Sequence, residues 1–305
     1  MVTLREVLKH AETEGVAIGH FNVSDWVTLK AVFESASDRN VPVIVGVSES
    51  ERHFLGVRQI AAMVKSLREE HDFPVFLNAD HSHSLASAME AAKAGFDSIV
   101  FDVSTLPLEE NIRQMRTAVE TLKAIRPEIL VEGEIGDIGS GSEIHDTAHD
   151  VRTGLTTAVE ARQFVEETKI DILAPAVGNM HGMLKSMVTG ETKKRLDIER
   201  IRAIKEQTQV FMTLHGASGT DDGDLRRAIA AGITVIHINT EVRIAWRRGL
   251  DSALATQPNE IVPYKILPQA IDSVKQRVAA RLALFSSGRL ASGPSSERSA
   301  AAQPR

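Results

Sequence analysis

The sequence predicts an α/β fold: a (β/α)₈ TIM barrel with long loops after strands five and six and a C-terminal helix. Eight short apolar runs, rich in β-branched residues, alternate with segments of helical period, which is the pattern of repeated βα units. These runs are continuous, as expected for parallel strands that are buried on both faces. The chain has 305 residues, enough for eight such units in one domain.

The predicted elements follow one another in βα order. The first strand is followed by a predicted helix over residues 24–40, and another is predicted over 84–95, ended by a glycine. A doubly wound sheet is the competing layout, and it usually carries a Gly-rich loop after its first strand. Here the first strand ends in FNVSDW, without glycine, which favours the barrel. The predicted strands are residues 16–23, 41–47, 73–80, 97–103, 128–135, 171–177, 210–216 and 234–240.

Two long polar loops interrupt this alternation, at residues 137–150 and 178–195. Loops of this length are often lids over active sites. The final helix, 268–285, carries an apolar stripe that fits packing either on its own barrel or on a partner subunit. We therefore expect one catalytic domain over residues 1–285. The Ser-, Ala-, Gly- and Arg-rich residues 286–305 are predicted to form a disordered tail.

Composition excludes several classes of protein. Hydrophobic residues make up 43% and charged residues 25%, as in soluble globular proteins. A formal charge of −6 argues against a nucleic-acid partner. The chain has no cysteine, which excludes disulfides and thiolate metal sites. The N-terminal segment lacks the apolar core of a secretory signal, and no apolar run approaches the ~20 residues of a membrane span, so a cytoplasmic protein without membrane contact is expected.

Chemically active side chains gather at the predicted strand ends. The active site of a TIM barrel lies at the C-terminal ends of its strands, so these side chains should converge. Chance could place a polar residue at one or two ends, but six consecutive ends filled with Asp, Glu and His indicate a functional site. The residues are Asp80 and His81 (strand three), Asp102 (four), Glu132 and Glu134 (five), His181 (after six), His215 (seven), and His237 and Asn239 (eight).

Three of the histidines, His81, His181 and His215, form a plausible metal site. Three protein ligands leave a position open for substrate, and nitrogen ligands suit Zn²⁺ or Co²⁺. The alternative is that each histidine is a hydrogen-bonded structural residue. His83 is interpreted as a loop residue near the site, and His145 and His149 as solvated side chains. No predicted strand core carries a lysine, which favours metal chemistry over a Schiff base.

A phosphate site is predicted at HGASG, residues 215–219, which precedes a helix. Small residues allow backbone amides to approach an anion, and the helix N-terminus adds positive potential. This loop follows the seventh strand, where barrels often bind phosphate. Gly182, Asn239 and Thr240 could complete the cradle that Gly216 and Ser218 begin.

The segments NADHSHSLASAMEAAKAGFDSIVFDVSTLPLEENI, VEGEIGDIGSGSE, APAVGNMHGMLK and LHGASG resemble those of a known family. This is the family of class II, metal-dependent fructose-bisphosphate aldolases, with the related tagatose-bisphosphate aldolases, and the resemblance covers nearly the whole chain. It implies a Zn-dependent ketose-1,6-bisphosphate aldolase that reversibly cleaves fructose 1,6-bisphosphate to dihydroxyacetone phosphate and glyceraldehyde 3-phosphate. It also implies a small phosphorylated sugar as substrate, a homodimer or homotetramer, and a monovalent cation near the phosphate.

The resemblance assigns roles by motif. Asp80 would be the acid/base at the hydroxyl on carbon 4, and Glu143, in the loop after strand five, the mobile acid that exchanges the proton on carbon 3. Asp102, Glu132 and Glu134 would hold the metal when it shifts, or bind a second ion. The Zn²⁺ ligands would be His81, His181 and His215, and the substrate and phosphate group would be bound by Asn22, Gly182, Gly216, Ser218, His237, Asn239 and Thr240.

Three departures from the family pattern affect the distal half of the substrate. His237 stands where an Asn is usual, Val103 where a Gly is common, and Tyr264 lies where an Asp-Pro-Arg-Lys stretch often occurs. Arg243, or a basic residue of another subunit, could replace the missing arginine. Three alternatives stay open: tagatose 1,6-bisphosphate or another phosphoketose as substrate, a non-catalytic sugar-phosphate-binding barrel, and a metallohydrolase. The last is disfavoured, because its His-x-His motif usually lies on the first strand.

Overall fold

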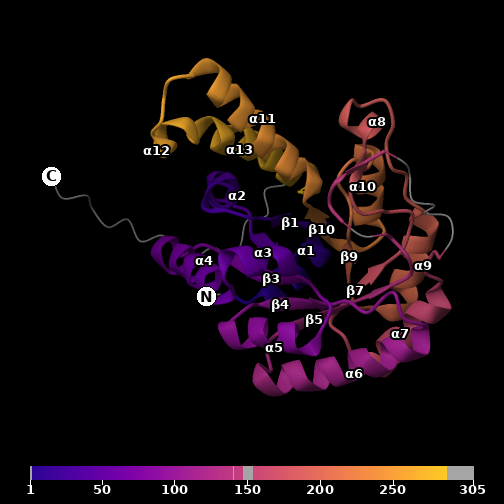
Figure 1. The fold of residues 1–305 in the computed structure, drawn as a ribbon. Helices are drawn as coiled ribbons and strands as arrows, with labels where there is room; N and C mark the ends of the chain where they lie inside the picture. Colours follow the sequence, from indigo (N-terminus) through magenta and orange to yellow (C-terminus); the bar gives the residue numbers. More distant parts are fainter. Residues whose placement is uncertain (1, 140, 147–153, 287–305) are drawn as a thin grey trace.

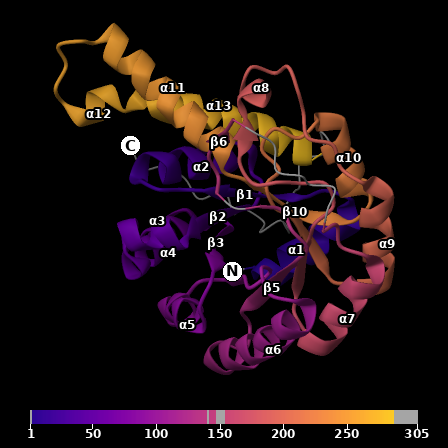
Figure 2. The same ribbon diagram turned by 45° about the vertical axis from the view of Figure 1, so that its right-hand side comes forward.

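The computed structural model describes residues 2–139, 141–146 and 154–286. Eight parallel strands close into a barrel in the order β1-β10-β9-β7-β5-β4-β3-β2, and helices surround it (Figures 1 and 2). Barrel strands that are consecutive in the chain pair with each other, and β1 pairs with β10 to close the barrel. The predicted TIM barrel is therefore confirmed.

All eight predicted strands form, with ends displaced by a few residues. The barrel strands are β1 (Ile18–Asn22), β2 (Val43–Ser48), β3 (Val75–Ser82), β4 (Ser98–Phe101), β5 (Leu130–Ile135), β7 (Ile172–Pro175), β9 (Phe211–Leu214) and β10 (Ile233–Ile238). The helices are α1 (Leu4–Glu14), α2 (Trp26–Arg39), α3 (Glu49–Leu55), α4 (Val57–His71), α5 (Leu85–Ala94), α6 (Leu108–Ile125), α7 (Ala158–Thr168), α8 (Lys185–Val188), α9 (Ile198–Thr208), α10 (Asp222–Ala230), α11 (Thr240–Thr256), α12 (Pro263–Ile266) and α13 (Pro268–Phe285).

The two long loops contain a second, very small sheet. Strand β6 (Ile144–His145) pairs in parallel with β8 (Met183–Leu184), and the Met183 amide donates to the Glu143 carbonyl at 2.9 Å. The loop after β5 is thereby joined to the loop after β7. The sequence did not predict this pair.

One end of the barrel is closed and the other is left for the site. Helix α1 packs Leu4, Val7 and Leu8 against inward-facing apolar residues of the strands, such as Phe76 and Phe211. A larger apolar core fills the space between the strands and the outer helices. Capping boxes at the N-termini of α1, α2, α3 and α7 fix where these helices begin.

The final helix packs on its own chain. Helix α13 runs beside α11 and contacts α2 (Figure 2), and the Ala17 amide donates to the Phe285 carbonyl at 3.1 Å. Of the predicted tail, residues 286–305, all but Ser286 lie outside the described residues. Within the described residues no helix is both long and apolar enough to span a membrane.

Candidate active site

The end of β3 presents Asp80 and His81 through an irregular backbone. The pairing of β3 with β4 shifts register between Ala79 and Ser82, and His81 adopts a left-handed φ of 46°. A buried arginine of α3, Arg52, donates to the carbonyl of Asp80 at 3.3 Å and to the hydroxyl of Ser82 at 2.9 Å. This strained turn at a functional strand end is held by the surrounding structure.

Three histidines that are far apart in the sequence meet above the barrel. The ring centroids of His81 lie 5.0 Å from His181 and 4.9 Å from His215, and the latter two rings are 6.0 Å apart. One ligand atom from each, together with a carboxylate oxygen of Glu134, lies within 4.8 Å of the others. The three imidazoles therefore lie close enough together to bind one ion, and their role as metal ligands stays a prediction.

A carboxylate orients His81. The Nδ1 atom lies 2.7 Å from Oδ2 of Asp102, whose other oxygen accepts from Ser104. The buried Nε2 has no hydrogen-bond partner among the described residues, so it is available to a metal. Burial lowers the pKa of His81, but Asp80 and Asp102 outweigh this and raise the pKa to about 9.

Two carboxylates of β5 flank His215. Its Nδ1 lies 2.8 Å from Glu134 and its Nε2 lies 2.6 Å from Glu132. Burial opposes the charged ring, but both carboxylates raise the pKa of His215 well above its ordinary value. Burial and the charges of its two histidine neighbours lower the pKa of His181. A divalent ion fits this donor set, because it would replace the protons that balance the carboxylates.

Asp80 is poised beside the histidines with one oxygen held and one oxygen unpaired. The Nδ2 atom of Asn22 donates to Oδ2 at 2.7 Å and to Glu51 at 3.0 Å. Oδ1 is buried without a hydrogen-bond partner among the described residues, 3.7 Å from His81 and 3.5 Å from His237. Although burial raises the pKa of Asp80, the adjacent His81 and His237 hold it well below its usual range.

His237 belongs to a stack of three imidazoles. Its ring lies 3.4 Å from that of His20, nearly parallel at 3°, and 4.3 Å from that of His215. The side-chain oxygen Oδ1 of Asn78 lies 3.1 Å from Nε2 of His20 and fixes that ring. A Cβ on Gly46 would come within 2.0 Å of the His20 ring, so only glycine fits there. The sequence held one signal for this arrangement: a His-x-Asn motif occurs at the end of β1 and another begins on β10 and ends just after it.

A narrow cavity of about 20 Å³ opens beside these groups. Apart from Ser142, every residue that lines it was predicted from the sequence to belong to the site. The Ser142 carbonyl accepts from the Thr240 hydroxyl at 3.2 Å, which places the loop after β5 over the start of α11. The lining residues are Asn22, Asp80, Ser142, His181, Gly182, Gly216, Ser218, His237, Asn239 and Thr240.

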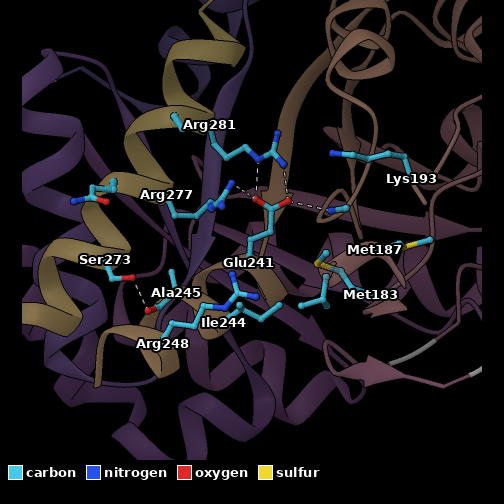
Figure 3. Close-up of a pocket in the computed structure, with 14 residues that line it drawn as sticks. Met183, Met187, Lys193, Glu241, Ile244, Ala245, Arg248, Ser273, Arg277 and Arg281 are labelled. Atoms are coloured by element: carbon cyan, nitrogen blue, oxygen red, sulfur yellow. Dashed lines mark hydrogen bonds and ion pairs between the residues drawn. The ribbon is translucent and has the colours of Figure 1, made fainter. Parts of the chain in front are cut away.

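Glu241 supports the HGASG loop from behind. Its carboxylate accepts from the Gly219 amide at 3.0 Å and from the Arg281 guanidinium at 2.8 and 2.6 Å (Figure 3). The loop is thus tied to both α11 and α13. A hollow of about 390 Å³, lined in part by Lys193 and Arg277, adjoins this contact.

A family model described as "Fructose-bisphosphate aldolase class-II" matches residues 2–289. The chain belongs to the class II fructose-bisphosphate aldolase family. A "Probable fructose-bisphosphate aldolase" of Bacillus subtilis is 33% identical over 94% of this chain and 98% of its own length. A "Fructose-bisphosphate aldolase" of Geobacillus stearothermophilus is also 33% identical, over 95% and 99%. The solved YdjI aldolase of Escherichia coli is similar, with a TM-score of 0.77, 27% identity, and coverage of 93% and 97%.

As a class II aldolase, the chain is a carbon–carbon lyase of a metal-dependent family. Its departures from the family pattern lie in different surroundings. His237 lies in the centre of the site, and Val103 packs against the apolar core. Tyr264 is 76% exposed on α12. Arg243 reaches the rim of the cavity, where it donates to Glu51 at 2.8 Å and to the Ser142 carbonyl at 3.4 Å.

The remaining predicted residues of this aldolase lie around the cluster. Glu143 is exposed beside β6, and His83 is exposed just beyond β3, as expected of a loop residue. His145 was expected to be solvated, which is wrong: it is half-buried in β6, against Gly182. His149 lies outside the described residues. Glu51 was not singled out, because a glutamate three residues after Ser48 is also what a helix capping box predicts.

Proposed function

We propose that this chain is a Zn²⁺-dependent aldolase that reversibly cleaves fructose 1,6-bisphosphate to dihydroxyacetone phosphate and glyceraldehyde 3-phosphate. One observation carries the proposal: three imidazoles converge beside a buried carboxylate whose Oδ1 has no hydrogen-bond partner among the described residues. Nitrogen ligands favour Zn²⁺ or Co²⁺ over harder ions. The ligands would be His81, His181 and His215, with Glu134 able to join them.

The chain's own residues would carry out the proton transfers. Asp80 removes the proton from the hydroxyl on carbon 4; the bond between carbons 3 and 4 breaks, and the aldehyde leaves. When bound, the divalent ion supplies Lewis-acid stabilisation of the negative charge that the other half acquires. Glu143 returns a proton to carbon 3. Asn22 and Glu51 keep Asp80 aimed, since Asn22 bonds both carboxylates.

The other polar groups would position the substrate. Asp102 and Glu132 orient His81 and His215, and a second bound ion at these carboxylates stays a prediction. Gly182, Gly216, Ser218, Asn239 and Thr240 would hold the phosphate of the dihydroxyacetone half. Arg243, held by Glu51, would meet the distal phosphate at the cavity rim.

Metal removal tests the proposal directly. Dialysis against EDTA is expected to abolish cleavage of fructose 1,6-bisphosphate in a coupled assay, and Zn²⁺ or Co²⁺ to restore it. Bound metal is measured in parallel by mass spectrometry. Full turnover by protein shown to be metal-free would reject the proposal.

Replacement of the base tests the role of Asp80. Asp80→Asn is expected to lower kcat by about 10²-fold or more, because the amide cannot accept the proton. Metal content should be unchanged. The matched control is Glu128→Gln, an exposed carboxylate that precedes β5. Turnover by Asp80→Asn equal to that of the control would remove Asp80 from the mechanism.

A second substrate is favoured by His237, which lies next to Asp80 where the family usually has Asn. Its ring could select another configuration at carbon 4, as in tagatose 1,6-bisphosphate. Parallel kcat/KM measurements on the two epimers decide between them. Tight binding of dihydroxyacetone phosphate without proton exchange at carbon 3 would instead indicate a non-catalytic binding protein.

The assembly and location of the protein stay predictions. We infer a homodimer or homotetramer of cytoplasmic location from the family resemblance and the composition. Sedimentation equilibrium of the purified chain measures the first, and fractionation of cells that express it measures the second. A monomer at all concentrations would contradict the predicted assembly.

A further inference from the structure

Lys194 is a buried cation that the proposed chemistry does not use. It follows the exposed Lys193 in the loop after β7, yet only 4% of Lys194 is exposed. Its Nζ donates to three backbone carbonyls, those of Met180 at 2.8 Å, Gly182 at 2.5 Å and Gly216 at 2.8 Å. The carbonyls of Met180 and Gly182 flank His181 in the loop after β7, and that of Gly216 follows His215 in the loop after β9. The ammonium therefore lies between these two loops.

Three carbonyls around one nitrogen require the charged form of the lysine. Each carbonyl only accepts, so Nζ must supply three hydrogens, which the ammonium has and the neutral amine lacks. Burial lowers the pKa of Lys194 to about 7, while the charge of Glu241 opposes this. Carbonyl oxygens that replace a hydration shell are also the means by which proteins hold bare monovalent cations.

The backbone of Lys194 is also hydrogen-bonded to the loop after β9. Its amide donates to the Gly219 carbonyl at 3.0 Å, its carbonyl accepts from Asp221 at 3.2 Å, and it forms a bridge with Thr220. The two loops approach closely: a Cβ on Gly216 would come within 2.2 Å of the Met180 carbonyl oxygen. Dipoles that converge in this way repel one another unless a cation lies between them.

We propose that the ammonium of Lys194 takes the place of the monovalent cation that the family resemblance implies, so that this chain shapes its phosphate cradle without K⁺ or Na⁺. The oxygens that would coordinate an ion already bind Nζ, so the residues present do not fit a separate ion. The inference rests on the proposed function only in taking Gly182 and Gly216 to hold phosphate.

A buried lysine of lowered pKa can also form a Schiff base with a ketose. The contacts oppose that role here, because three carbonyls engage all the hydrogens of Nζ and an ammonium has no lone pair for attack. Borohydride treatment with dihydroxyacetone phosphate is therefore expected to leave the mass of the protein unchanged. A trapped adduct at Lys194 would overturn the proposal.

Exchange of the buffer cation tests the proposal on the intact holoenzyme. In tetramethylammonium buffer, addition of K⁺ or Na⁺ is expected to change the affinity for inorganic phosphate, measured by calorimetry, by less than about twofold beyond the general salt effect. Added K⁺ or Na⁺ should raise the midpoint temperature of thermal unfolding no more than added choline does. A specific gain of about tenfold on adding K⁺ or Na⁺ would overturn the proposal.

The variant Lys194→Ala leaves the three carbonyls without a cation. Its affinity for inorganic phosphate in tetramethylammonium buffer should fall by about tenfold or more, and K⁺ or Na⁺ should restore it. Lys193→Ala removes the same charge from an exposed position and serves as the matched control. Unchanged affinity in Lys194→Ala, or a loss that no alkali cation reverses, would overturn the proposal.

A crystallographic measurement covers the case in which Lys194→Ala does not fold. Wild-type crystals soaked in Rb⁺ are expected to show no anomalous peak among the carbonyls of Met180, Gly182 and Gly216, and a peak there would overturn the proposal. None of these readouts depends on aldol cleavage. A failed cleavage assay with the expected cation behaviour would refute only the proposed function.

Discussion

His237 is the departure that most directly touches the chemistry of the site. Its ring is stacked between His20 and His215, and its Nδ1 lies 3.5 Å from Asp80. The stack depends on a residue with no side chain, because the His20 ring occupies the space of a Cβ on Gly46. Both faces of the His237 ring are thus closely packed.

His237→Ala is expected to lower kcat by about tenfold, because Asp80 loses a neighbour that positions it. His237 lowers the pKa of Asp80, so its removal should raise that pKa and move the acidic limb of the kcat/KM profile to higher pH. The pH dependence of cleavage measures both effects. The exposed His53→Ala is the control, and an unshifted acidic limb in His237→Ala would contradict this role.

The strand-end residues could be predicted from the sequence, and the residues that support them could not. Asp80, His81 and His215 end apolar runs, so a rule about barrel strands placed them together. Lys194 stands in a polar KK pair that is typical of a solvated loop, and Glu51 in a helix start. Their roles arise from contacts between distant segments, with carbonyls and with Asn22, which local patterns do not encode.

The HGASG loop depends on two helices for its position. Glu241 of α11 and Arg281 of α13 form a buried pair, and Glu241 also binds the Gly219 amide. Burial raises the pKa of Glu241, but the hydrogen bonds and charge of Arg281 lower it by more. The pKa of Glu241 is therefore lower than its ordinary value. The carboxylate is therefore charged in the folded protein at neutral pH.

Glu241→Gln is expected to reduce the free energy of unfolding by about 1.5–3 kcal/mol at neutral pH, because Arg281 loses its buried charged acceptor and keeps, among the described residues, only the ion pair with Asp222 at 2.6 Å. The folded-state pKa of Glu241 lies below its unfolded value. Its stabilisation is therefore complete above the unfolded pKa and is lost as the pH falls through the folded pKa.

Urea unfolding of the wild type and Glu241→Gln across acidic and neutral pH measures this difference. The gap between the two proteins should narrow as the pH falls below about 4.5. Glu69→Gln removes a carboxylate from the exposed pair with Lys65 and should change stability little. A gap that stays constant with pH would contradict the assigned charge state.

The eight barrel strands and the small sheet between the loops differ in how far the sequence reveals them. Each barrel strand is an apolar run that periodicity detects. Strands β6 and β8 have two residues each and lie in polar loops far apart in the chain. Nothing in their composition marks them as strands, and they exist because the folded barrel brings the two loops together.

The first barrel strand meets the end of the last helix. The backbone hydrogen bond from Ala17 to Phe285 links the start of β1 to the end of α13, and the Phe285 side chain is fully buried. The predicted domain over residues 1–285 therefore includes α13 as part of the packed structure. The sequence left two possibilities for this helix, packing on its own barrel or on a partner subunit. In the described residues α13 packs on its own barrel.

Phe285→Ala is expected to lower the free energy of unfolding by about 3–5 kcal/mol, because it leaves a cavity where α13 meets the barrel. Phe54→Ala is the matched control, since that ring is 77% exposed. Chemical denaturation followed by circular dichroism measures both variants. Equal stability of the two would mean that α13 contributes little to the fold.

The parallel pair of β6 and β8 also bears on how this enzyme could be redesigned. Among the residues that the structure describes, β6 and β8 pair only with each other, through contacts such as Met183 with Glu143. If one loop were replaced by that of a relative, the backbone of the other loop would lose these hydrogen bonds. The segment that presents His181 would then be disturbed. A chimaera that aims to alter specificity should therefore transplant both loops as one unit.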